Sequence, residues 1–416
     1  MNVLNKYFGG RVVGKQKIWL LAIIILVTAG CHGFQYVNWP FGNFLFNILL
    51  ILISYIILIN IRFYKSGNFT VLVILFIALP FFSIINSWTL YGQSIWMGLK
   101  ANFNFSFCWV LYFFLHLFKI KESTIIHTLL YISIFIVAVQ VIQQFTYPNA
   151  LFGLYSEDFV TEKGLHERAD FRNGLWRFRI DQNCYFTAPI LFFLHIWIKK
   201  KINLKLGVFF VLLLVSVYLT LTRQVIFAVL ISLFFSFLMN NTKRSYMGYF
   251  IIGILLGILV YIYYDTLFGE MSEKTMDDMN KDNIRLYSAV YYWNDSLRDI
   301  YTFLFGYGVP GSEGSFHNNV ENLHTLGLYA VDVGFIGIIW RFGFIYVALS
   351  YYLLYCIFFK YKKFTPMYIR LFVIFVFSMS IMVFPFGANS VMTIVWPLLL
   401  YICDIHINNL KLAVYQ

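Results

Sequence analysis

Charge is scarce in this sequence, and several motifs that would identify a soluble enzyme are missing. Only 12% of the 416 residues are charged and 60% are hydrophobic, whereas soluble domains have roughly 25% and 45–50%. A P-loop, a dinucleotide-binding glycine pattern and an exposed serine elbow are absent. The five cysteines have no short spacing, which favours small buried side chains over a disulfide or metal framework. They are Cys31, Cys108, Cys184, Cys356 and Cys403.

Apolar runs recur along the chain, and each is long enough to cross a hydrocarbon core of about 30 Å. We therefore expect an all-α polytopic integral membrane protein with about 12 transmembrane helices, forming a single integral membrane domain over residues 1–416. The first run ends in CHGF and not in a cleavage motif, so we expect a retained helix. The expected spans are 18–34, 42–60, 70–90, 102–118, 124–145, 183–198, 205–221, 224–239, 247–264, 326–359 (broken or tilted), 368–385 and 388–403.

The basic residues predict the orientation. With the N-terminus inside, the inner segments hold 19 of the 31 basic residues but only two of the 19 acids, Glu122 and Asp404. Both termini are then expected to be cytoplasmic. The net charge of +12 is spread over short loops as a topology signal and does not indicate a nucleic-acid partner. Two outer loops, 146–182 and 265–325, are long enough to be functional. Since they face away from the cytoplasm, a donor substrate would have to arrive already activated in the lipid.

Arginine is enriched on the predicted outer side. It outnumbers lysine there by eight to four, whereas the inner side has 15 lysines and four arginines. The planar guanidinium suits bidentate binding of phosphate and carboxylate, so this bias favours an anionic ligand. The alternative is a set of ion pairs with the outer acids. The outer arginines are Arg168, Arg172, Arg177, Arg179, Arg223, Arg285, Arg298 and Arg341.

Three of these arginines lie next to predicted helix starts. Arg223 sits in a very short hairpin between two spans, where its charge needs a partner such as a lipid-linked phosphate or ordinary lipid headgroups. Arg177 and Arg179 precede DQNCYFTAP, which opens another span. A helix N-terminus favours anions, so they could contribute to a phosphate site. The polar residues Asp181 and Asn183 are also consistent with simple helix capping.

The segment around Arg285 predicts an amphipathic helix on the outer membrane surface. Tyr287, Val290, Tyr291 and Asn294 repeat there at helical spacing. Such an aromatic stripe is typical of an interfacial anchor, and stacking on sugar rings is the second interpretation.

The sharpest candidate for catalysis is the stretch 306–343, a glycine-rich polar loop that we expect to pass into an apolar helix without a break. His317, Glu321 and His324 would project from one face of that helix. They suit a general base for an acceptor hydroxyl or structural hydrogen bonds. A metal site is conceivable, but no further cluster completes it, so neither metal nor cofactor is expected. Asp332 and Arg341 could pair with one another or with this set.

Four segments, in this order, resemble the bacterial O-antigen polymerase and ligase superfamily, Wzy-type polymerases in particular. They are RFRIDQNCYFTAP, LTRQVIFAVL, IRLYSAVYYWNDSLRDIYTFLFGYG and HNNVENLHTLGLYAVDVGFIG, and together they cover roughly residues 140–345. Gln182 stands where the family has proline, and Thr222 where it has glycine or serine. The histidine-to-glycine spacing departs from the ligase pattern, because Gly334 lies ten residues after His324, which favours a polymerase over a ligase.

The resemblance implies a GT-C-like glycosyltransferase in the bacterial inner membrane, with its active site at the periplasmic face. It would join undecaprenyl-pyrophosphate-linked oligosaccharide repeat units by inverting, metal-independent transfer. Arg177, Arg223 and Arg285 would hold the pyrophosphate, with His317 or His324 near the acceptor hydroxyl. The alternatives are an O-antigen ligase acting on lipid A core and, in a different class, a lipid-linked oligosaccharide flippase. A flippase would distribute charge through many spans. Whether a chain-length regulator is a partner stays open.

Overall fold

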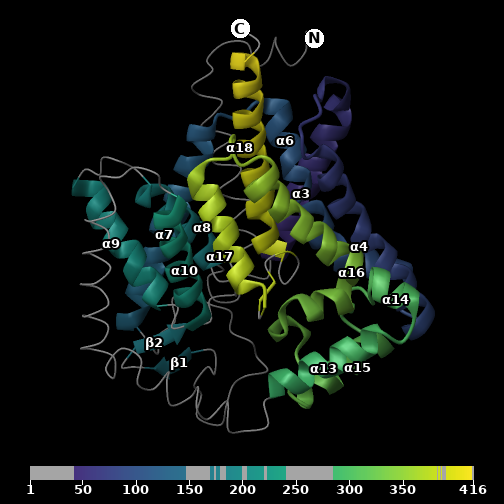
Figure 1. The fold of residues 1–416 in the computed structure, drawn as a ribbon. Helices are drawn as coiled ribbons and strands as arrows, with labels where there is room; N and C mark the ends of the chain where they lie inside the picture. Colours follow the sequence, from purple (N-terminus) through teal and green to yellow (C-terminus); the bar gives the residue numbers. More distant parts are fainter. Residues whose placement is uncertain are drawn as a thin grey trace.

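The computed structural model describes much of the chain as a helical assembly (Figure 1). The expected spans 18–34 and 247–264, most of the first outer loop and residues 265–283 of the second lie outside the described residues. The described residues are 42–146, 169–172, 175–178, 184–198, 204–219, 223–239, 284–381, 383–384, 386 and 390–414.

The helices begin and end close to the apolar runs of the sequence. The first group is α3 (Gly42–Asn60), the 3-10 turn η2 (Ile61–Phe63), α4 (Thr70–Tyr91), α5 (Ile95–Phe107), α6 (Val110–Phe118) and α7 (Glu122–Thr146). The second is β1 (Ala169–Arg172), β2 (Leu175–Phe178), α8 (Cys184–Trp197), α9 (Leu204–Leu219) and α10 (Arg223–Met239). The third is α13 (Ile284–Ser296), α14 (Ile300–Phe305), α15 (Ser315–Thr325), η4 (Ala330–Asp332), α16 (Gly334–Tyr355), the π-helical η5 (Cys356–Lys360), α17 (Met367–Met379) and α18 (Ser390–Val414).

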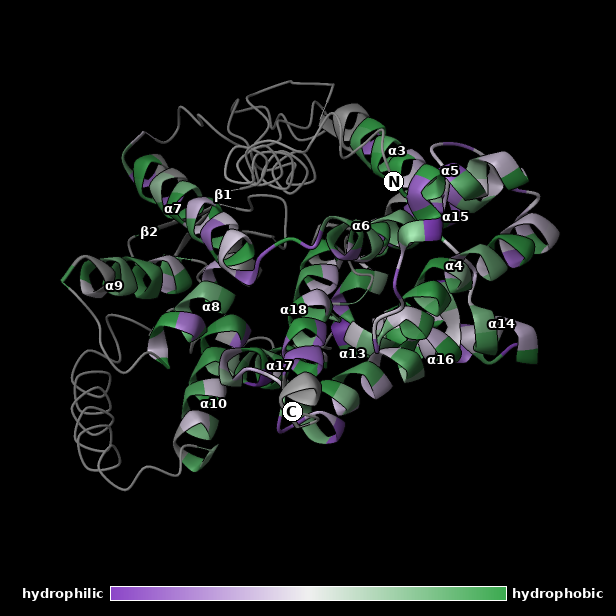
Figure 2. Cartoon of the chain, turned by 90° about the horizontal axis from the view of Figure 1, so that it is seen from above, coloured by the Kyte–Doolittle hydropathy of each residue, from purple (hydrophilic) through white to green (hydrophobic). Residues whose placement is uncertain are grey.

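Several of these helices are long and apolar enough to cross a membrane. Within the described residues, three qualify outright: Thr70–Tyr91, Glu122–Thr146 and Gly334–Lys360. The pair Ile95–Phe103 and Phe105–Phe118, bent by 44°, would make a fourth. Apolar residues run along most of the described helices (Figure 2). The chain therefore has the character of a multi-pass membrane protein, as the sequence predicts. The hairpin of β1 and β2, antiparallel within the outer loop 146–182, was not predicted.

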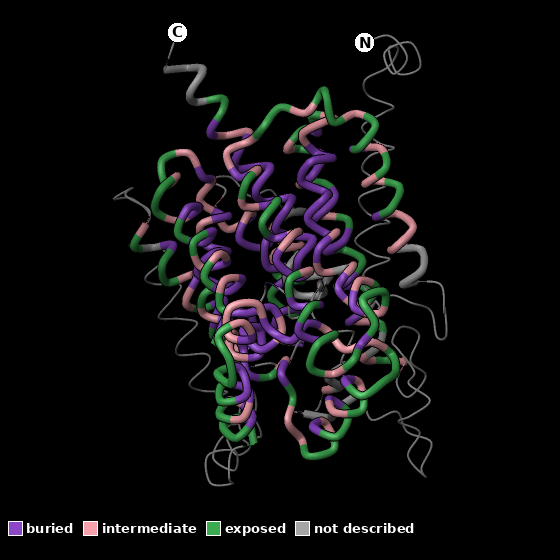
Figure 3. Tube along the Cα trace, turned by 90° about the vertical axis from the view of Figure 1, so that its right-hand side faces the viewer, coloured by how far each residue is buried: buried purple, intermediate pink, exposed green. Residues whose placement is uncertain are grey.

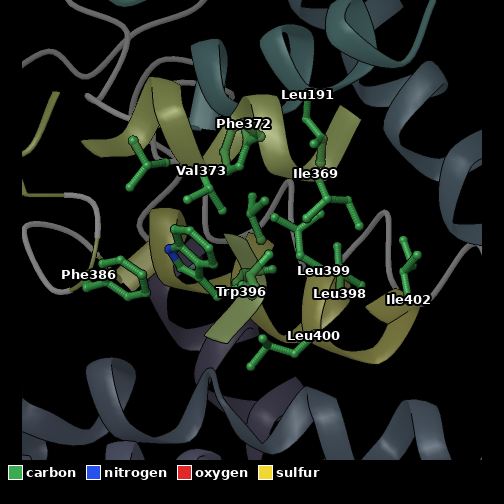
Figure 4. Close-up of a cluster of buried hydrophobic side chains, with 14 of the residues drawn as sticks. Leu191, Ile369, Phe372, Val373, Phe386, Trp396, Leu398, Leu399, Leu400 and Ile402 are labelled. Carbon is green, nitrogen blue, oxygen red and sulfur yellow. The ribbon is translucent and has the colours of Figure 1, made fainter. Parts of the chain in front are cut away.

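The centre of the assembly is an aromatic and aliphatic core between α17, α18 and α8 (Figure 4). Trp396 of α18 stacks on Phe386 with ring centroids 4.2 Å apart and touches Phe372 of α17. Burial is concentrated along these central helices, and exposed residues lie toward the periphery (Figure 3). Since aromatic side chains bury the largest areas, this core fixes how the helices pack.

One sequence expectation is wrong. The polar stretch does not pass into the apolar helix without a break, and the run expected at 326–359 starts later. α15 ends at Thr325 and α16 begins only at Gly334. The cause is a Schellman motif: Gly327 has φ +77°, its N–H donates to the carbonyl of His324 (2.9 Å), and the N–H of Leu328 donates to that of Leu323 (2.9 Å). This pattern ends a helix with a left-handed glycine, so the His317, Glu321 and His324 stripe lies on a separate helix.

α16 is itself interrupted at Gly343, whose φ and ψ are 85° and 167°. A non-helical residue removes intrahelical donors from the carbonyls of the preceding turn. Here the N–H of Tyr307 donates to the carbonyl of Trp340 and the N–H of Gly308 to that of Arg341, both at 2.7 Å. The glycines of the GYG sequence and of the break allow this approach: a Cβ on Gly306 would lie 2.4 Å from the carbonyl carbon of Arg341.

Two amide side chains, Asn86 of α4 and Gln93 two residues after its end, hold the same loop from the other side. Asn86 Nδ2 donates to the carbonyl of Gly306 (2.8 Å). Gln93 accepts from the N–H of Gly311 (2.8 Å) and donates to the carbonyl of Val309 (3.2 Å). The loop therefore has its backbone groups satisfied by two candidate spans, α4 and α16. We call residues 284–343 the outer lobe; α13, α14 and α15 lie at the end of the molecule away from the C-terminal end of α18 (Figure 1).

Replacing Gly343 with alanine should destabilise the protein more than the same change at Gly314. Both glycines have a similar backbone, with φ 85° and 97°, but a Cβ on Gly343 would lie 2.0 Å from the carbonyl oxygen of Leu304, whereas nothing lies within 4 Å at Gly314. We expect Gly314→Ala to cost about 1–2 kcal/mol for the backbone alone and Gly343→Ala about 1–3 kcal/mol more for the overlap. Thermal unfolding in detergent measures both. Equal effects would mean that the close approach to α14 is not tight.

Candidate functional site

α15 carries two stripes side by side. Phe316, Val320 and Leu323 are buried, and Phe316 stacks on Tyr91 of α4 with centroids 4.5 Å apart. The predicted polar stripe starts one residue later, at His317, and so lies about 100° around the helix from the buried stripe. This placement leaves both histidines half-buried at the edge of the packed face.

The second half of the polar stripe forms a small interacting group. Nδ1 of His324 lies 3.4 Å from Oε1 of Glu321, and the imidazole stacks on Tyr329 with centroids 4.8 Å apart. A proton on Nδ1 facing the carboxylate leaves Nε2 as the acceptor nitrogen. His317 forms no hydrogen bond with the described residues, so the structure pairs Glu321 with only one of the two predicted histidines.

α13 packs its polar face inward. Ser288, Tyr292 and Asp295 are buried, and the Tyr292 hydroxyl donates to the carbonyl of Leu328 (2.9 Å). Asp295 accepts from Trp340 Nε1 of α16 (2.8 Å) and pairs with Arg298 Nε (2.9 Å). Arg298, one of the outer arginines, therefore forms an ion pair with an acidic side chain. This is the alternative to ligand binding that the arginine bias leaves open.

Arg341 is in a different environment. It is half-buried on α16, two residues before the break, and its Nε is buried without a hydrogen bond to the described residues. No described carboxylate lies at ion-pair distance, so the expected pairing with Asp332 or the α15 stripe is not formed. Arg341 interacts electrostatically with Tyr292 of α13: burial raises the pKa of Tyr292 to about 12, and the guanidinium of Arg341 opposes part of that rise.

The structure places Arg285 in the first turn of α13, exposed, where it does make an interaction. Three and seven residues later on the same face are the buried Ser288 and Tyr292. Arg285 therefore continues the face of α13 that turns toward α16. A Cβ on Gly327 would lie 2.7 Å from the Ile284 side chain, so the start of α13 also lies beside the end of α15.

The remaining predicted arginines are placed only in part. Arg177 lies in β2, opposite Asp170 of β1 in the antiparallel register. Arg223 is the first residue of α10, and only three residues separate it from the end of α9 at Leu219, which confirms the very short connection. Arg179, and the capping residues Asp181 and Asn183, lie outside the described residues.

The elements that carry the described candidates meet at the ring of Trp340. It contacts Tyr292 of α13 (5.1 Å), Tyr307 of the GYG loop (5.4 Å) and Phe316 of α15 (6.0 Å). The next residue on α16 is Arg341. The structure thus brings Arg285, Arg341 and the α15 stripe into one lobe, around an aromatic cluster.

Sequence reasoning missed several polar residues that organise the lobe. Asn86 and Gln93 stand in and next to an otherwise apolar run, and that isolation was the available signal. Asp295 carries no such signal, because its neighbour Asn294 fits the exposed pattern of the helix. Its role depends on a residue 45 positions away, which no local pattern reveals.

A second polar cluster lies at the opposite end of the protein, around the fully buried Asp404 of α18. Its Oδ1 accepts from the backbone N–H and the side-chain amide of Asn68, both at 2.8 Å. Its Oδ2 accepts from the Tyr112 hydroxyl and lies 3.1 Å from Nε2 of His116, both on α6. The carboxylate therefore joins α18 to α6 and to the segment before α4.

The other predicted inner acid is also matched with a histidine. Oε2 of Glu122, at the start of α7, lies 2.9 Å from Nε2 of His406 on α18. The Tyr368 hydroxyl donates to its Oε1 (3.4 Å). Both inner acids thus hold the C-terminal half of α18, from different sides.

No group of three or more His, Cys, Asp or Glu side chains in the part of the chain that the structure describes has the arrangement of a metal site. The α15 stripe supplies at most the Glu321 and His324 pair. In comparisons with known proteins, no protein-family model and no curated protein matches the chain.

Asp295→Ala should destabilise the outer lobe more than Asp295→Asn. Alanine leaves the buried indole N–H of Trp340 without an acceptor, which costs about 1–3 kcal/mol. Asparagine keeps that acceptor and loses only the pair with the exposed Arg298, worth about 0–1 kcal/mol. Thermal unfolding in detergent separates the two, with Arg298→Ala as the control. A large effect of Arg298→Ala would contradict this ranking.

Asp404→Asn should lower stability by about 1–3 kcal/mol for each donor left without an acceptor, because the amide nitrogen that replaces one carboxylate oxygen cannot accept from the Tyr112 hydroxyl or from Nε2 of His116. Glu122→Gln is the matched control: its pair with His406 is about one-third exposed on both sides, so solvent screens it and the loss should be much smaller. Thermal unfolding of both variants, purified in the same detergent, makes the comparison. Similar losses would mean that burial does not distinguish the two carboxylates.

Proposed function

We propose that this protein is an O-antigen-type polymerase, which joins lipid-linked oligosaccharide repeat units at the outer face of the bacterial inner membrane. The observation that carries the proposal is the position of Arg341: a guanidinium half-buried in an apolar helix, with no described carboxylate beside it. An unpaired charge inside an apolar span is costly, about 2.5–3.5 kcal/mol on insertion scales where it lies at the membrane centre. Such a residue is maintained where an anionic ligand uses it.

The donor in this reaction carries an anion at the required depth. The undecaprenyl chain lies in the bilayer and its pyrophosphate at headgroup level. We assign two described arginines to the pyrophosphate: Arg341, seven residues after the start of the candidate span Gly334–Lys360, and Arg285 at the start of α13, which also makes an interaction within the protein. Arg223 and Arg177 join them by the sequence resemblance. Guanidinium groups bind pyrophosphate in bidentate fashion and stabilise the charge that develops as it leaves.

The α15 stripe supplies the base. A hydroxyl oxygen of the acceptor sugar attacks the anomeric carbon of the donor from the face opposite the leaving group, so the configuration inverts. The bond from that carbon to the phosphate oxygen breaks, and undecaprenyl pyrophosphate leaves with the electron pair. The hydroxyl proton passes to Nε2 of His324, whose Nδ1 proton faces Glu321. His317, one turn earlier on the same stripe, is the alternative base.

The finer architecture belongs to the same proposal. It includes about 12 spans, a GT-C-like arrangement, cytoplasmic termini and both long loops in the periplasm. One feature supports it: the described hairpin of the first loop and the described helices of the second lie away from the C-terminal end of α18 (Figure 1).

Alanine at Arg341, Arg285 or Arg223 should abolish polymer while the protein still accumulates in the membrane. Arg341→Lys should also lose most activity, since lysine keeps the charge but not the bidentate geometry. The control is Arg298→Ala, which removes an outer arginine that is already paired with Asp295. Surface polysaccharide is separated on a gel and the protein is measured by immunoblot. Normal polymer from the Arg341 and Arg285 variants would refute the pyrophosphate role.

Deletion of the protein distinguishes the three functions that the sequence leaves open. A polymerase defect leaves a single repeat unit on lipid A core and no ladder. Full-length polymer stranded on undecaprenyl pyrophosphate would identify a ligase. Repeat units trapped at the cytoplasmic face would identify a flippase.

A further inference from the structure

α13 has an apolar stripe that the rest of the described protein does not cover. Leu286, Val290, Trp293 and Leu297 recur at intervals of four, three and four residues, so they share one side of the helix. Leu286 is 63% exposed and Leu297 50%, and Ile300 at the start of α14 is 72% exposed. The buried face of α13, with Ser288, Tyr292 and Asp295, is on the other side. The helix is thus inverted relative to a soluble surface helix: its polar face packs and its apolar face is open.

The stripe is continuous with the sides of two candidate spans. Trp293 contacts Phe303 of α14 edge to face (6.2 Å), and Phe303 stacks on Phe344 of α16 (5.2 Å). Phe344 is exposed within the span Gly334–Lys360. A row of rings therefore leads from the open face of α13 to the apolar flank of a helix that can cross a membrane.

α14 makes the same connection to α4. Its Tyr301 hydroxyl donates to the carbonyl of Phe82 (3.2 Å), and Phe305 packs on the Phe82 ring (5.2 Å). Phe82 and Ile85 are exposed on α4, which is also a candidate span. The open apolar surface of α13 and α14 is therefore bordered on both sides by surfaces that would face lipid.

Positive charge at the two ends of the stripe is also consistent with a position in the membrane interface. Two exposed arginines stand at the ends of α13: Arg285 precedes Leu286 and lies on the neighbouring face with Ser288, and Arg298 follows Leu297 and pairs with Asp295. Amphipathic helices that lie in the membrane interface place cations beside an apolar face in this way, with the cations at the level of the lipid phosphates.

We propose that α13 and α14 dock onto the bilayer, with the Leu286, Val290, Trp293 and Leu297 stripe buried among the lipids of the outer leaflet. The surface is an interaction site for lipid and stands independently of the proposed enzymatic function. Of the interfacial stripe expected from sequence, Val290 lies in this open face and the exposed Tyr287 and Asn294 lie at its edge, whereas the half-buried Tyr291 lies nearer the face of Asp295. Through Trp340, the docked helix would fix the depth of the outer lobe relative to the headgroups.

The test is a spin-label measurement on the full chain in nanodiscs of phosphatidylethanolamine and phosphatidylglycerol. The native cysteines are replaced, and single cysteines are introduced by Leu286→Cys, Val290→Cys and Leu297→Cys and labelled with a nitroxide. Collision rates with oxygen, which partitions into lipid, and with a water-soluble nickel chelate report the surroundings. Ser288→Cys, on the buried face of the same helix, and Glu313→Cys, on an exposed polar loop, are the controls.

We expect oxygen collisions to exceed nickel-chelate collisions several-fold at the three stripe positions and the reverse at position 313. Position 288 should be protected from both reagents. Stripe labels that collide with the nickel chelate as position 313 does would place the stripe in water and overturn the proposal. Stripe labels protected from both reagents, as at position 288, would show that a second copy or another protein covers the face, and would overturn it as well. Neither readout depends on polymer synthesis.

Discussion

The outer lobe depends on two backbone hydrogen bonds at the break in α16. Gly343 interrupts the helix, and the carbonyls of Trp340 and Arg341 then accept from the N–H groups of Tyr307 and Gly308. Inside an apolar environment each unpaired carbonyl would be costly, so the loop is an obligatory partner of the break. The same exchange positions the ring of Trp340, on which α13, α15 and the loop converge. The polar residues of the lobe are therefore positioned first by these backbone hydrogen bonds and second by side-chain contacts.

At the opposite end of the protein, a charged side chain satisfies the buried hydrogen-bond donors. Asp404 is fully buried, and four donor groups from Asn68, Tyr112 and His116 surround it. A buried carboxylate with so many partners specifies one register of α18 against α6, because displacement by one helical turn would leave all of them unmatched. Such specificity is a recognised role of buried polar groups, although they add little net stability. The arrangement of the helices thus depends on glycines and backbone hydrogen bonds at one end of the protein, and on a buried carboxylate at the other end.

Sequence reasoning located most of the helices and only part of the site. Apolar runs such as 70–90 and 124–145 are helices because a segment of that length and composition has few other ways to satisfy its backbone in lipid. The stripe on α15 followed from spacing alone. Hydropathy carries no information on positive φ angles. The apolar run that starts at 326 therefore gives no indication of the Schellman motif at Gly327. The hydrogen bond between Asp295 and Trp340, and the one that Asn86 donates to the glycine-rich loop, join residues far apart in the sequence. A single sequence does not show such contacts.

The position of Arg341 connects the fold to the proposed chemistry. Its carbonyl is held by Gly308 and its neighbour Trp340 is fully packed, so the helix segment that carries the guanidinium has little freedom. A fixed cation loses less entropy on binding an anion and requires less reorganisation than a mobile one. Arg298 shows the contrast: it is exposed, and Asp295 already neutralises it. Of the outer arginines that the structure describes in detail, Arg341 is therefore the one whose surroundings suit a ligand more than a salt bridge.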